Sequence, residues 1–547
     1  MRRSGSRKMD GHHNHNLRSD HHPYVASPTD EGESPEGGPE SGYLPRDGGT
    51  GSPPSSDDEG ADRAEAGRRR WALALFSATT VLLFADQNLM SPNLTAIAED
   101  FGLSNDERDR KLGGDISLAF FLVGAPASFL VGVLADSGNR ARIFGWTVFA
   151  GELACLLTYF ARSYRQLYLC RAVTGFGVGG ALPVIYSVLG DLYGAGDRHV
   201  ASALVSFGLG AGISLGQAVA GYLGPIYGWR LPFLVISVPA LVCAALVCTT
   251  VEDPERGAME TARGEAEREG LVAEEGGVAL VPITSRSNLV DADASHDYVE
   301  ARAGADHAKS GGGGGSSTGS WRDHVESGIG LLSTRSVALS LFQGAPGCVP
   351  WGVINVFLND YLSEDRGFSV QSATTVLMCF SLGYALGLLV GGAGGKRLYE
   401  TDPRLPCLLA GGTAIAGCFP LWYLLNGVDS STPFGVAATT ALAAGLLAAP
   451  TGPIVKATLT NVTLPRARGQ AFALFNLFDD LGKGLGPYLV SLLIVGCGGR
   501  RAAFNTGVLG WVLCGVANLA MFFTVARDER AVQAALSAGR TGVPPCY

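Results

Sequence analysis

Apolar residues are gathered into blocks along the chain, and polar or charged residues separate one block from the next. A helix needs about 20 apolar residues to cross the roughly 30 Å of hydrocarbon in a membrane. The runs are continuous rather than alternating, which excludes a transmembrane barrel. The pattern predicts twelve membrane-spanning helices, at residues 71–97, 116–136, 142–161, 167–190, 200–225, 231–250, 337–361, 370–392, 405–425, 434–456, 470–496 and 503–525. The expected fold class is therefore an all-α polytopic membrane protein.

Polar segments divide the predicted spans into two sets of six. Residues 1–69 have a low-complexity composition that cannot bury a core, so a disordered cytosolic tail is expected there. Residues 252–334 contain the Gly311–Gly315 run and are expected to be a flexible cytosolic linker. Two six-helix bundles are expected at 70–251 and 335–526, followed by a cytosolic tail at 527–547. This layout is typical of a transporter that rocks two bundles about a central site.

Basic residues near the ends of the spans set the expected orientation, because they are retained on the cytosolic side. With the N-terminus in the cytosol, the cytosolic side would hold 13 such residues and the opposite side 9. The moderate bias predicts that both termini are cytosolic. Arg108, Lys111 and Arg500 are among the basic residues placed on the opposite side.

Composition narrows the class further. Hydrophobic residues make up 47% of the chain and charged residues only 17%, against roughly 25% charged in soluble proteins. This excludes a soluble enzyme, a nucleic-acid-binding protein and a secreted disulfide scaffold. Of the 11 cysteines, all but Cys546 lie in or beside apolar segments and are interpreted as small buried hydrophobes. No metal site, cofactor or catalytic set is predicted from the motifs.

The loop after the second span carries the most specific motif, Gly132-Val-Leu-Ala-Asp136-Ser-Gly138-Asn139-Arg140-Ala-Arg142. It resembles the signature of the major facilitator superfamily, as does Arg171-Ala-Val-Thr-Gly175-Phe-Gly177 in the fourth span. The resemblance implies the two-bundle fold of that superfamily. It also implies a conformational gate, for which the candidate residues are Gly132, Asp136, Arg140 and Arg142.

Within the superfamily, three further stretches resemble the Spinster group. They are Phe84-Ala-Asp86-Gln87, Ala125-Pro126 with the residues up to Arg140, and Asp253-Pro-Glu-Arg-Gly257. The resemblance implies a lysolipid or sphingoid phosphate as substrate, with proton coupling in some members. Gln87, Val178 and Lys483 depart from the group's pattern, so substrate and coupling stay open.

Inserting an ionisable residue into the centre of a membrane helix costs roughly 2.5–3.5 kcal/mol, so each such residue is expected to have a structural or functional role. The candidates for a substrate or proton pathway are Asp86, Gln87, Glu152, Arg171, Gln343, Asn355, Asp479, Asp480 and Lys483. Structural ion pairing is the alternative: Lys483 is one helical turn from Asp479 and Asp480, and Arg171 could pair with Asp86 or Glu152. Four acids then face two bases. Burying the surplus carboxyl groups in their protonated form costs less free energy than burying them ionised.

In the seventh span, Pro346 and Pro350 lie between Gln343 and Asn355. A proline-kinked gate with polar hydrogen-bonding groups and simple bending of the helix are equal alternatives. Lys456, at the end of the tenth span, could attract an anionic substrate, although snorkelling to the lipid headgroups is the simpler interpretation.

The expected function is secondary active transport by alternating access, of a small organic anion or a lysolipid-like amphiphile. Proton coupling is left open, as is the alternative of a transporter-like receptor or sensor without net transport. The expected partners are the substrate, membrane lipids and, where coupling exists, protons. The protein is expected to act as a monomer in the plasma membrane or in an endolysosomal or vacuolar membrane.

Overall fold

A computed structural model of the protein describes residues 56–192, 198–253, 331–464 and 467–541. Within these residues all regular secondary structure is helical. Ten segments of the described chain are helical, long and apolar enough to cross a membrane. The two other predicted spans fall on α7 (Arg198–Tyr227) and α19 (Arg468–Gly496), which have 30 and 29 residues. The predicted all-α polytopic fold is confirmed, and the helices agree with twelve spans.

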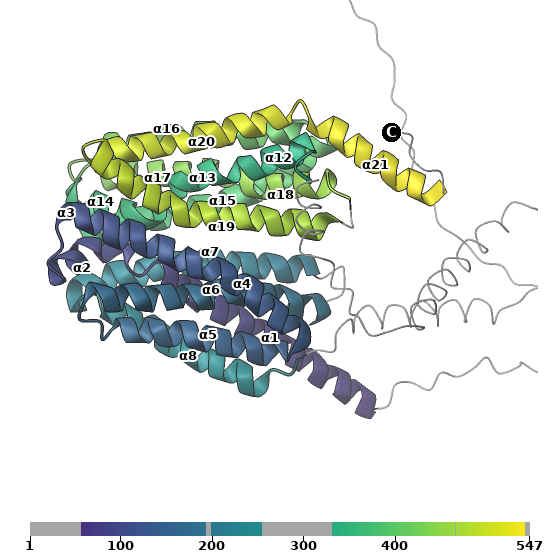
Figure 1. Cartoon of the computed structure of the whole chain (residues 1–547), viewed down its shortest axis with the longest axis horizontal. Coiled ribbons are helices and arrows are strands. Elements are labelled where there is room, and N and C mark those ends of the chain that lie inside the picture. The colour runs from purple at the N-terminus through teal and green to yellow at the C-terminus, as the bar shows by residue number, and fades with distance from the viewer. Residues whose placement is uncertain (1–55, 193–197, 254–330, 465–466, 542–547) are drawn as a thin grey trace, which may run out of the picture. The chain divides into compact units, whose positions relative to one another are not determined.

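The first half of the chain forms one group of helices, coloured purple to teal in Figure 1. Here α6 packs on both α4 and α5, and α8 packs on α5. The elements are α1 (Ser56–Gln87), η1 (Ser91–Asn93), α2 (Leu94–Asp100), α3 (Asn105–Glu107), η2 (Arg108–Asp115), α4 (Ile116–Ser137), α5 (Arg140–Thr158), α6 (Tyr164–Leu192), α7 and α8 (Leu231–Thr250).

The second half forms the group coloured green to yellow. Here α15 packs on α17, α16 on α20, and α13 on α19. The elements are α12 (Arg335–Phe342), α13 (Gly344–Gly352), η3 (Val353–Phe357), α14 (Leu358–Glu364), α15 (Val370–Thr401), α16 (Leu405–Asn426), α17 (Phe434–Ala448), α18 (Thr451–Asn461), α19, α20 (Arg500–Met521) and α21 (Val525–Thr541).

Local sequence explains several boundaries. The side chain of Asn139 accepts a hydrogen bond from the backbone N–H of Arg142 and so caps the start of α5. Ser369 caps α15 in the same way. Pro450, which has no N–H to donate, stands where α17 ends and α18 begins, so the predicted tenth span is broken into two helices.

Two predicted boundaries differ from the structure. Residues 56–69 were expected to belong to a disordered tail, but they are the first turns of α1. Their Ala and Glu residues are good helix formers, and they join directly to the apolar part of the helix. At its other end α1 stops at Gln87 instead of continuing to residue 97, because the chain turns at Asn88–Met90 and re-enters helix with Pro92 in η1. The expected linker and the first 55 residues lie outside the described residues.

Glycines set how closely the helices approach. A Cβ at Gly175 of α6 would lie 2.1 Å from the backbone oxygen of Phe120 on α4, and one at Gly216 of α7 would lie 2.0 Å from the backbone oxygen of Ala85 on α1. No side chain fits at either distance, so the backbones touch only because these residues are glycine. The second contact fixes α7 against the residue next to Asp86.

Large apolar side chains cover much of the outer surface, for example Phe129, Leu389 and Phe419, which are 71%, 70% and 72% exposed. An exposed apolar surface of this kind is stable only against lipid. Together with the ten long apolar helices, it makes this an integral, multi-pass membrane protein.

The two halves meet through α4 with α19 and through α7 with α15. For orientation, the α2 end is the end of the helices that holds η1, α2, α3 and α14, and the α21 end is the opposite end, which holds α21 (Figure 1).

Candidate functional site

A buried ion pair joins α1 to α6 near the α2 end. Nη1 of Arg171 lies 2.5 Å from Oδ1 of Asp86, and Nη2 donates to the backbone oxygen of Asp86 at 3.1 Å. The two side chains are 2% and 0% exposed. The predicted pairing of Arg171 with an acid of the first half is thus present, and Asp86 is the partner. Asp86 lies one residue before the end of α1 rather than at the middle of the predicted span.

Glu152 and Cys155, one turn apart on α5, complete the N-half cluster of Asp86, Glu152, Cys155 and Arg171. The Cys155 thiol donates to Oδ1 of Asp86 at 2.9 Å. One ligand atom from each of Asp86, Glu152 and Cys155 lies within 4.8 Å of the others. Both carboxyl oxygens of Glu152, and Oδ2 of Asp86, are buried without a hydrogen-bond partner among the described residues.

Aromatic rings cover the guanidinium of this cluster. The rings of Phe120 on α4 and Phe233 on α8 each lie 5.7 Å from Arg171 Cζ. Five helices, α1, α4, α5, α6 and α8, therefore enclose the cluster, and its side chains are at most 2% exposed. Charges enclosed in this way interact more strongly than charges in water, so the ionisation of each group depends on its neighbours.

The second half carries its own charged group on α19. Nζ of Lys483 lies 2.7 Å from Oδ2 of Asp479, and the side chains are 44% and 32% exposed. The Cys348 thiol of α13 donates to Oδ1 of Asp479 at 3.4 Å. Lys456 on α18 is exposed and lies within Coulombic range of Asp479 and Lys483. The predicted pair on one helix face therefore involves Asp479, while the Asp480 side chain lies outside the described residues.

The remaining candidates for the pathway differ in their surroundings. Gln343 is buried, where its Oε1 accepts from the Cys514 thiol at 3.0 Å and from Asn518 at 3.4 Å. Its hydrogen bonds therefore hold α12 and α13 to α20 inside the second half. Asn355 is half-buried in η3, and Gln87 is half-buried at the end of α1. The helix of the predicted seventh span is interrupted: Gln343 separates α12 from α13, and the π-helical η3 follows Pro350 within three residues.

The predicted gate residues lie at the α21 end. Arg140 donates from its backbone N–H and from Nε to Asp253, at 2.8 and 2.9 Å, and so ties the loop after α4 to the chain after α8. Arg142 is exposed in the first turn of α5. A Cβ at Gly132 would meet nothing within 4 Å, so in this conformation no helix presses against it. The side chain of Asp136 lies outside the described residues.

Sequence reasoning missed the strongest group of ion pairs, which lies at the α2 end between the halves. Arg500, at the start of α20, donates to Asp109 of η2 from Nη2 at 2.5 Å and from Nε at 2.8 Å. The same guanidinium reaches Asp360 of α14 at 2.7 Å and Asp365 at 2.9 Å. Arg500, Asp109 and Asp360 are almost fully buried, at 5%, 3% and 1% exposure.

Residues of the first half complete this group, which is called the interlock below. Thr95 donates from its backbone N–H to Asp360 at 2.9 Å and from its hydroxyl at 3.1 Å. Arg108 donates to that hydroxyl at 2.9 Å and to Asp109 at 3.0 Å. The interlock therefore consists of Thr95, Arg108 and Asp109 of the first half and Asp360, Asp365 and Arg500 of the second.

The hydrogen bonds and ion pairs described between the halves all lie at the α2 end. Besides the interlock, they comprise one bond between the hydroxyls of Tyr222 on α7 and Thr375 on α15, at 2.7 Å. The sequence signal was the presence of Asp360 inside a predicted span and of Asp109 near one, beside arginines that were interpreted only as loop charges. An ion pair between residues 391 positions apart cannot be predicted from the spacing of neighbouring residues in the sequence.

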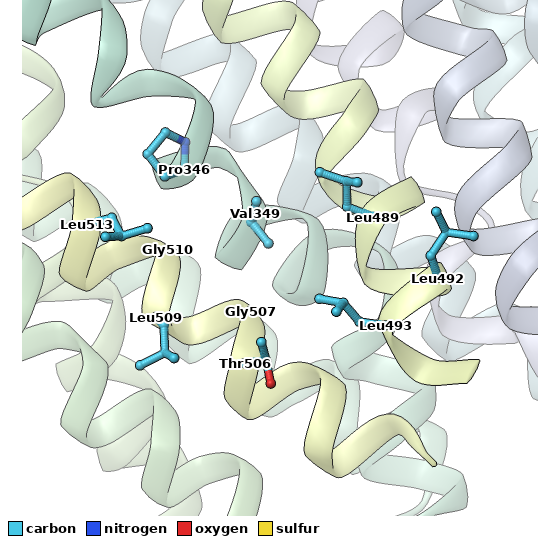
Figure 2. A pocket seen from close by; sticks show the side chains of 10 residues that line it. All are labelled: Pro346, Val349, Leu489, Leu492, Leu493, Thr506, Gly507, Leu509, Gly510 and Leu513. Atoms are coloured by element: carbon cyan, nitrogen blue, oxygen red, sulfur yellow. The ribbon is translucent and has the colours of Figure 1, made fainter. Parts of the chain in front are cut away.

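An apolar groove of about 520 Å³ lies between α13, α19 and α20. Figure 2 shows Leu489 and Leu493 of α19 on one side of it, Leu509 and Leu513 of α20 on the other, and Pro346 and Val349 at its back. Thr506 is the one hydroxyl-bearing residue in the lining, and its hydroxyl already donates to Ala502. The groove offers no polar group to orient a ligand.

The chain matches the family model described as Major Facilitator Superfamily over residues 76–304 and 341–545. Since the match takes in most of the chain, this protein belongs to the major facilitator superfamily.

Two solved structures share its fold. A bacterial homologue of the human lysosomal transporter Spinster, in an inward-facing and unoccupied conformation, aligns with a TM-score of 0.60 at 17% identity and covers 85% of this chain and 98% of its own. A D-xylose–proton symporter aligns with a TM-score of 0.56 at 17% identity, covering 83% and 97%. At this identity the likeness concerns the fold, and it agrees with the resemblance to the Spinster group seen in the sequence.

Among curated relatives, a putative metabolite transport protein of Haemophilus influenzae is 29% identical over 163 residues, which are 30% of this chain and 38% of the relative. Synaptic vesicle glycoprotein 2B of Rattus norvegicus is 28% identical over 174 residues, or 31% of this chain and 24% of the relative. The matched stretches thus span less than two fifths of these relatives' own lengths.

Proposed function

We propose that this protein is a secondary active transporter that works by alternating access, with its two bundles, residues 70–251 and 335–526, rocking against each other. One observation carries the proposal: the interlock, a buried group of ion pairs and hydrogen bonds, joins the two halves at the α2 end. Such bonds close one end and must break when the other end closes. Each half has its own internal contacts, so the halves can move as units while the interlock opens.

The orientation of the chain in the membrane determines on which side this conformation is closed. With both termini in the cytosol, the α2 end faces the outside or an organelle lumen and the α21 end faces the cytosol. The conformation is then closed to the outside. The inward-facing Spinster homologue aligns over most of its length, which supports this assignment.

The substrate class follows from the charges that remain accessible. Lys456 is exposed, has no ion-pair partner among the described residues and stands within Coulombic range of the Asp479–Lys483 pair. An exposed lysine at this position favours an anionic group. The ring of Tyr384 on α15 lies 5.2 Å from the ring of Trp351, measured between centroids. These two rings offer aromatic surface to an apolar part of the substrate. We assign a small organic anion or a lysolipid-like amphiphile, with proton coupling through the buried carboxyl groups.

A two-step experiment tests this function. An unbiased metabolite and lipid comparison between cells with and without the protein identifies what accumulates, and the purified protein in liposomes is then assayed for flux of that compound. Net flux that depends on the protein supports transport. Binding of the compound without flux would instead identify a receptor or sensor.

A disulfide that can be formed and reduced between the two halves makes the flux assay specific for alternating access. A Cβ at Gly114 of η2 would lie 2.9 Å from Cβ of Ser491 on α19, so a small shift brings two cysteines there to disulfide distance, about 3.5–4.5 Å between Cβ atoms. Oxidation of the Gly114→Cys/Ser491→Cys protein should stop flux, and reduction should restore it. The single variants Gly114→Cys and Ser491→Cys, treated alike, are the controls and should show no response to oxidant.

A further inference from the structure

Three carboxyl oxygens in the N-half cluster lack a donor: Oδ2 of Asp86 and both oxygens of Glu152. They are buried beyond the reach of solvent, and a buried polar atom without a partner is costly. An ionised carboxylate can only accept hydrogen bonds, whereas a protonated one gains an O–H that donates. A single proton would therefore supply the donor that this cluster lacks.

The balance of positive and negative charges around Glu152 also favours the binding of one proton. Asp86 of α1 and Glu152 of α5 are the acids, and among the described residues Arg171 of α6 is the single base in contact with them. The other titratable groups that face Glu152 are the thiols of Cys155 on α5 and Cys243 on α8. α4 and α8 contribute the apolar rings of Phe120 and Phe233. With both acids ionised, one negative charge would remain enclosed and uncompensated.

The hydrogen bonds decide which acid holds the proton. Oδ1 of Asp86 accepts from Arg171 at 2.5 Å and from the Cys155 thiol at 2.9 Å, so this carboxylate is stabilised as an anion. No described group donates to Glu152. Its carboxyl oxygen lies within 4.8 Å of an oxygen of Asp86, a gap that a side-chain rotation can close to bring an O–H towards the unpartnered Oδ2.

We infer that Glu152 is the proton-holding residue of this protein: in the present conformation it is a neutral carboxylic acid next to the ionised Asp86–Arg171 pair. The inference deepens the proposed function, since it names the coupling group, but the protonation itself does not depend on transport. A divalent metal would suit the oxygen and sulfur donors, but Arg171 already occupies Asp86 and supplies the positive charge.

The arrangement indicates how the proton would be released. Both carboxyl groups compete for one guanidinium, so a movement of α6 relative to α1 that brings Arg171 to Glu152 stabilises the Glu152 anion. The O–H bond of Glu152 then breaks, and its proton passes to water that reaches the opened cluster. No electron transfer is involved.

Infrared spectroscopy of the purified full-length protein tests the inference without any substrate. An un-ionised carboxylic acid has a carbonyl stretching band separate from those of carboxylates and amides. The wild type minus Glu152→Gln difference spectrum, recorded at neutral pH in H2O and in D2O, should contain this band. The matched control is Glu400→Gln on α15, whose side chain is 61% exposed, and its difference spectrum should show loss of carboxylate bands only.

A second variant distinguishes the proton from a simple packing effect. In Asp86→Asn the guanidinium loses its partner, so Glu152 should give up its proton to pair with Arg171, and the acid band should disappear although Glu152 is still present. Glu152→Gln itself should keep the thermal midpoint of the wild type, because it mimics the neutral acid. The inference is overturned if the difference spectrum of Glu152→Gln shows carboxylate loss, or if the acid band survives in Asp86→Asn. A failure of the flux assay with these results intact would contradict the transport function alone.

Discussion

Arg500 and Asp109 face each other with two hydrogen bonds across the boundary between the halves, at 2.5 and 2.8 Å, although 391 residues separate them in the chain. Both side chains are 4% exposed. Arg500 also holds Asp360 and Asp365 of its own half, so one guanidinium organises carboxylates from η2, from α14 and from the turn that follows α14. A buried, hydrogen-bonded charge is expensive to leave alone, so in the proposed transport cycle this pair acts as a two-state latch: made when the α2 end is closed, and hydrated when it opens.

Asp109→Asn should weaken that latch. Removal of one partner from a buried pair costs about 3–5 kcal/mol, and here the loss falls on the closed α2 end alone. The expected result is faster labelling of a cysteine at Gly114 by a membrane-impermeant maleimide in a folded protein. The matched control is Asp100→Asn, which breaks the exposed Arg230–Asp100 pair at the same end, where a surface pair contributes about 0–1 kcal/mol. Equal labelling rates in the two variants would refute the latch.

Either Asp86 or Glu152 should be able to neutralise the positive charge of Arg171 when the other acid is removed. Asp86→Asn alone should destabilise the protein only modestly, because Glu152 can take over the negative charge. Asp86→Asn combined with Glu152→Gln leaves a buried guanidinium without a carboxylate, at a cost of about 3–5 kcal/mol. Thermal unfolding of the wild type, both single variants and the double variant in detergent measures the coupling. Additive losses would show that Glu152 does not replace Asp86.

Gly175→Ala should force α4 and α6 apart. The new methyl group would lie 2.1 Å from the Phe120 backbone oxygen, which cannot rotate away, so overpacking should cost about 1–3 kcal/mol. Gly210→Ala on α7 is the control, since its methyl group meets nothing within 4 Å and the helix gains about 0.5–1 kcal/mol from the loss of a glycine. Thermal midpoints should move in opposite directions for the two variants.

Asp136→Asn should reduce transport while leaving the amount of folded protein nearly unchanged. Asp136 stands in the superfamily motif at the α21 end, and a charge contact made there in one conformation shifts the balance of states by about 1–3 kcal/mol when it is lost. Initial uptake rates in liposomes, normalised to folded protein, check this. Wild-type rates in the variant would contradict a gating role.

Both termini should lie in the cytosol. Ten long apolar helices plus α7 and α19 give an even number of crossings, and the basic residues favour the α21 end as the cytosolic end. Protease added to intact cells should spare a tag at either terminus and cleave it after permeabilisation. Cleavage of either tag before permeabilisation would contradict this topology, and with it the assignment of the closed α2 end to the outside.

Local patterns in the sequence were enough to place the helices. Membrane crossing is a property of about 20 consecutive residues, so apolar blocks marked the spans. The pair Asp479–Lys483 was also readable, because residues four apart share one helix face. Arg171 was recognisable as a partner for a first-half acid, but spacing alone left Asp86 and Glu152 as equal candidates.

Only the tertiary structure chose between those candidates and brought Arg500 to Asp109. Burial, orientation and the number of donors around a carboxyl group depend on several helices at once, and no local window contains them. Gln343 shows the same limit, because its polar character predicted a pathway residue while its contacts with Cys514 and Asn518 hold two helices together. The sequence by itself determined that two helical bundles cross a membrane with charges inside them. Which charges neutralise one another, and which end the interlock closes, was decided by packing, because ion pairs form between surfaces that meet only after folding.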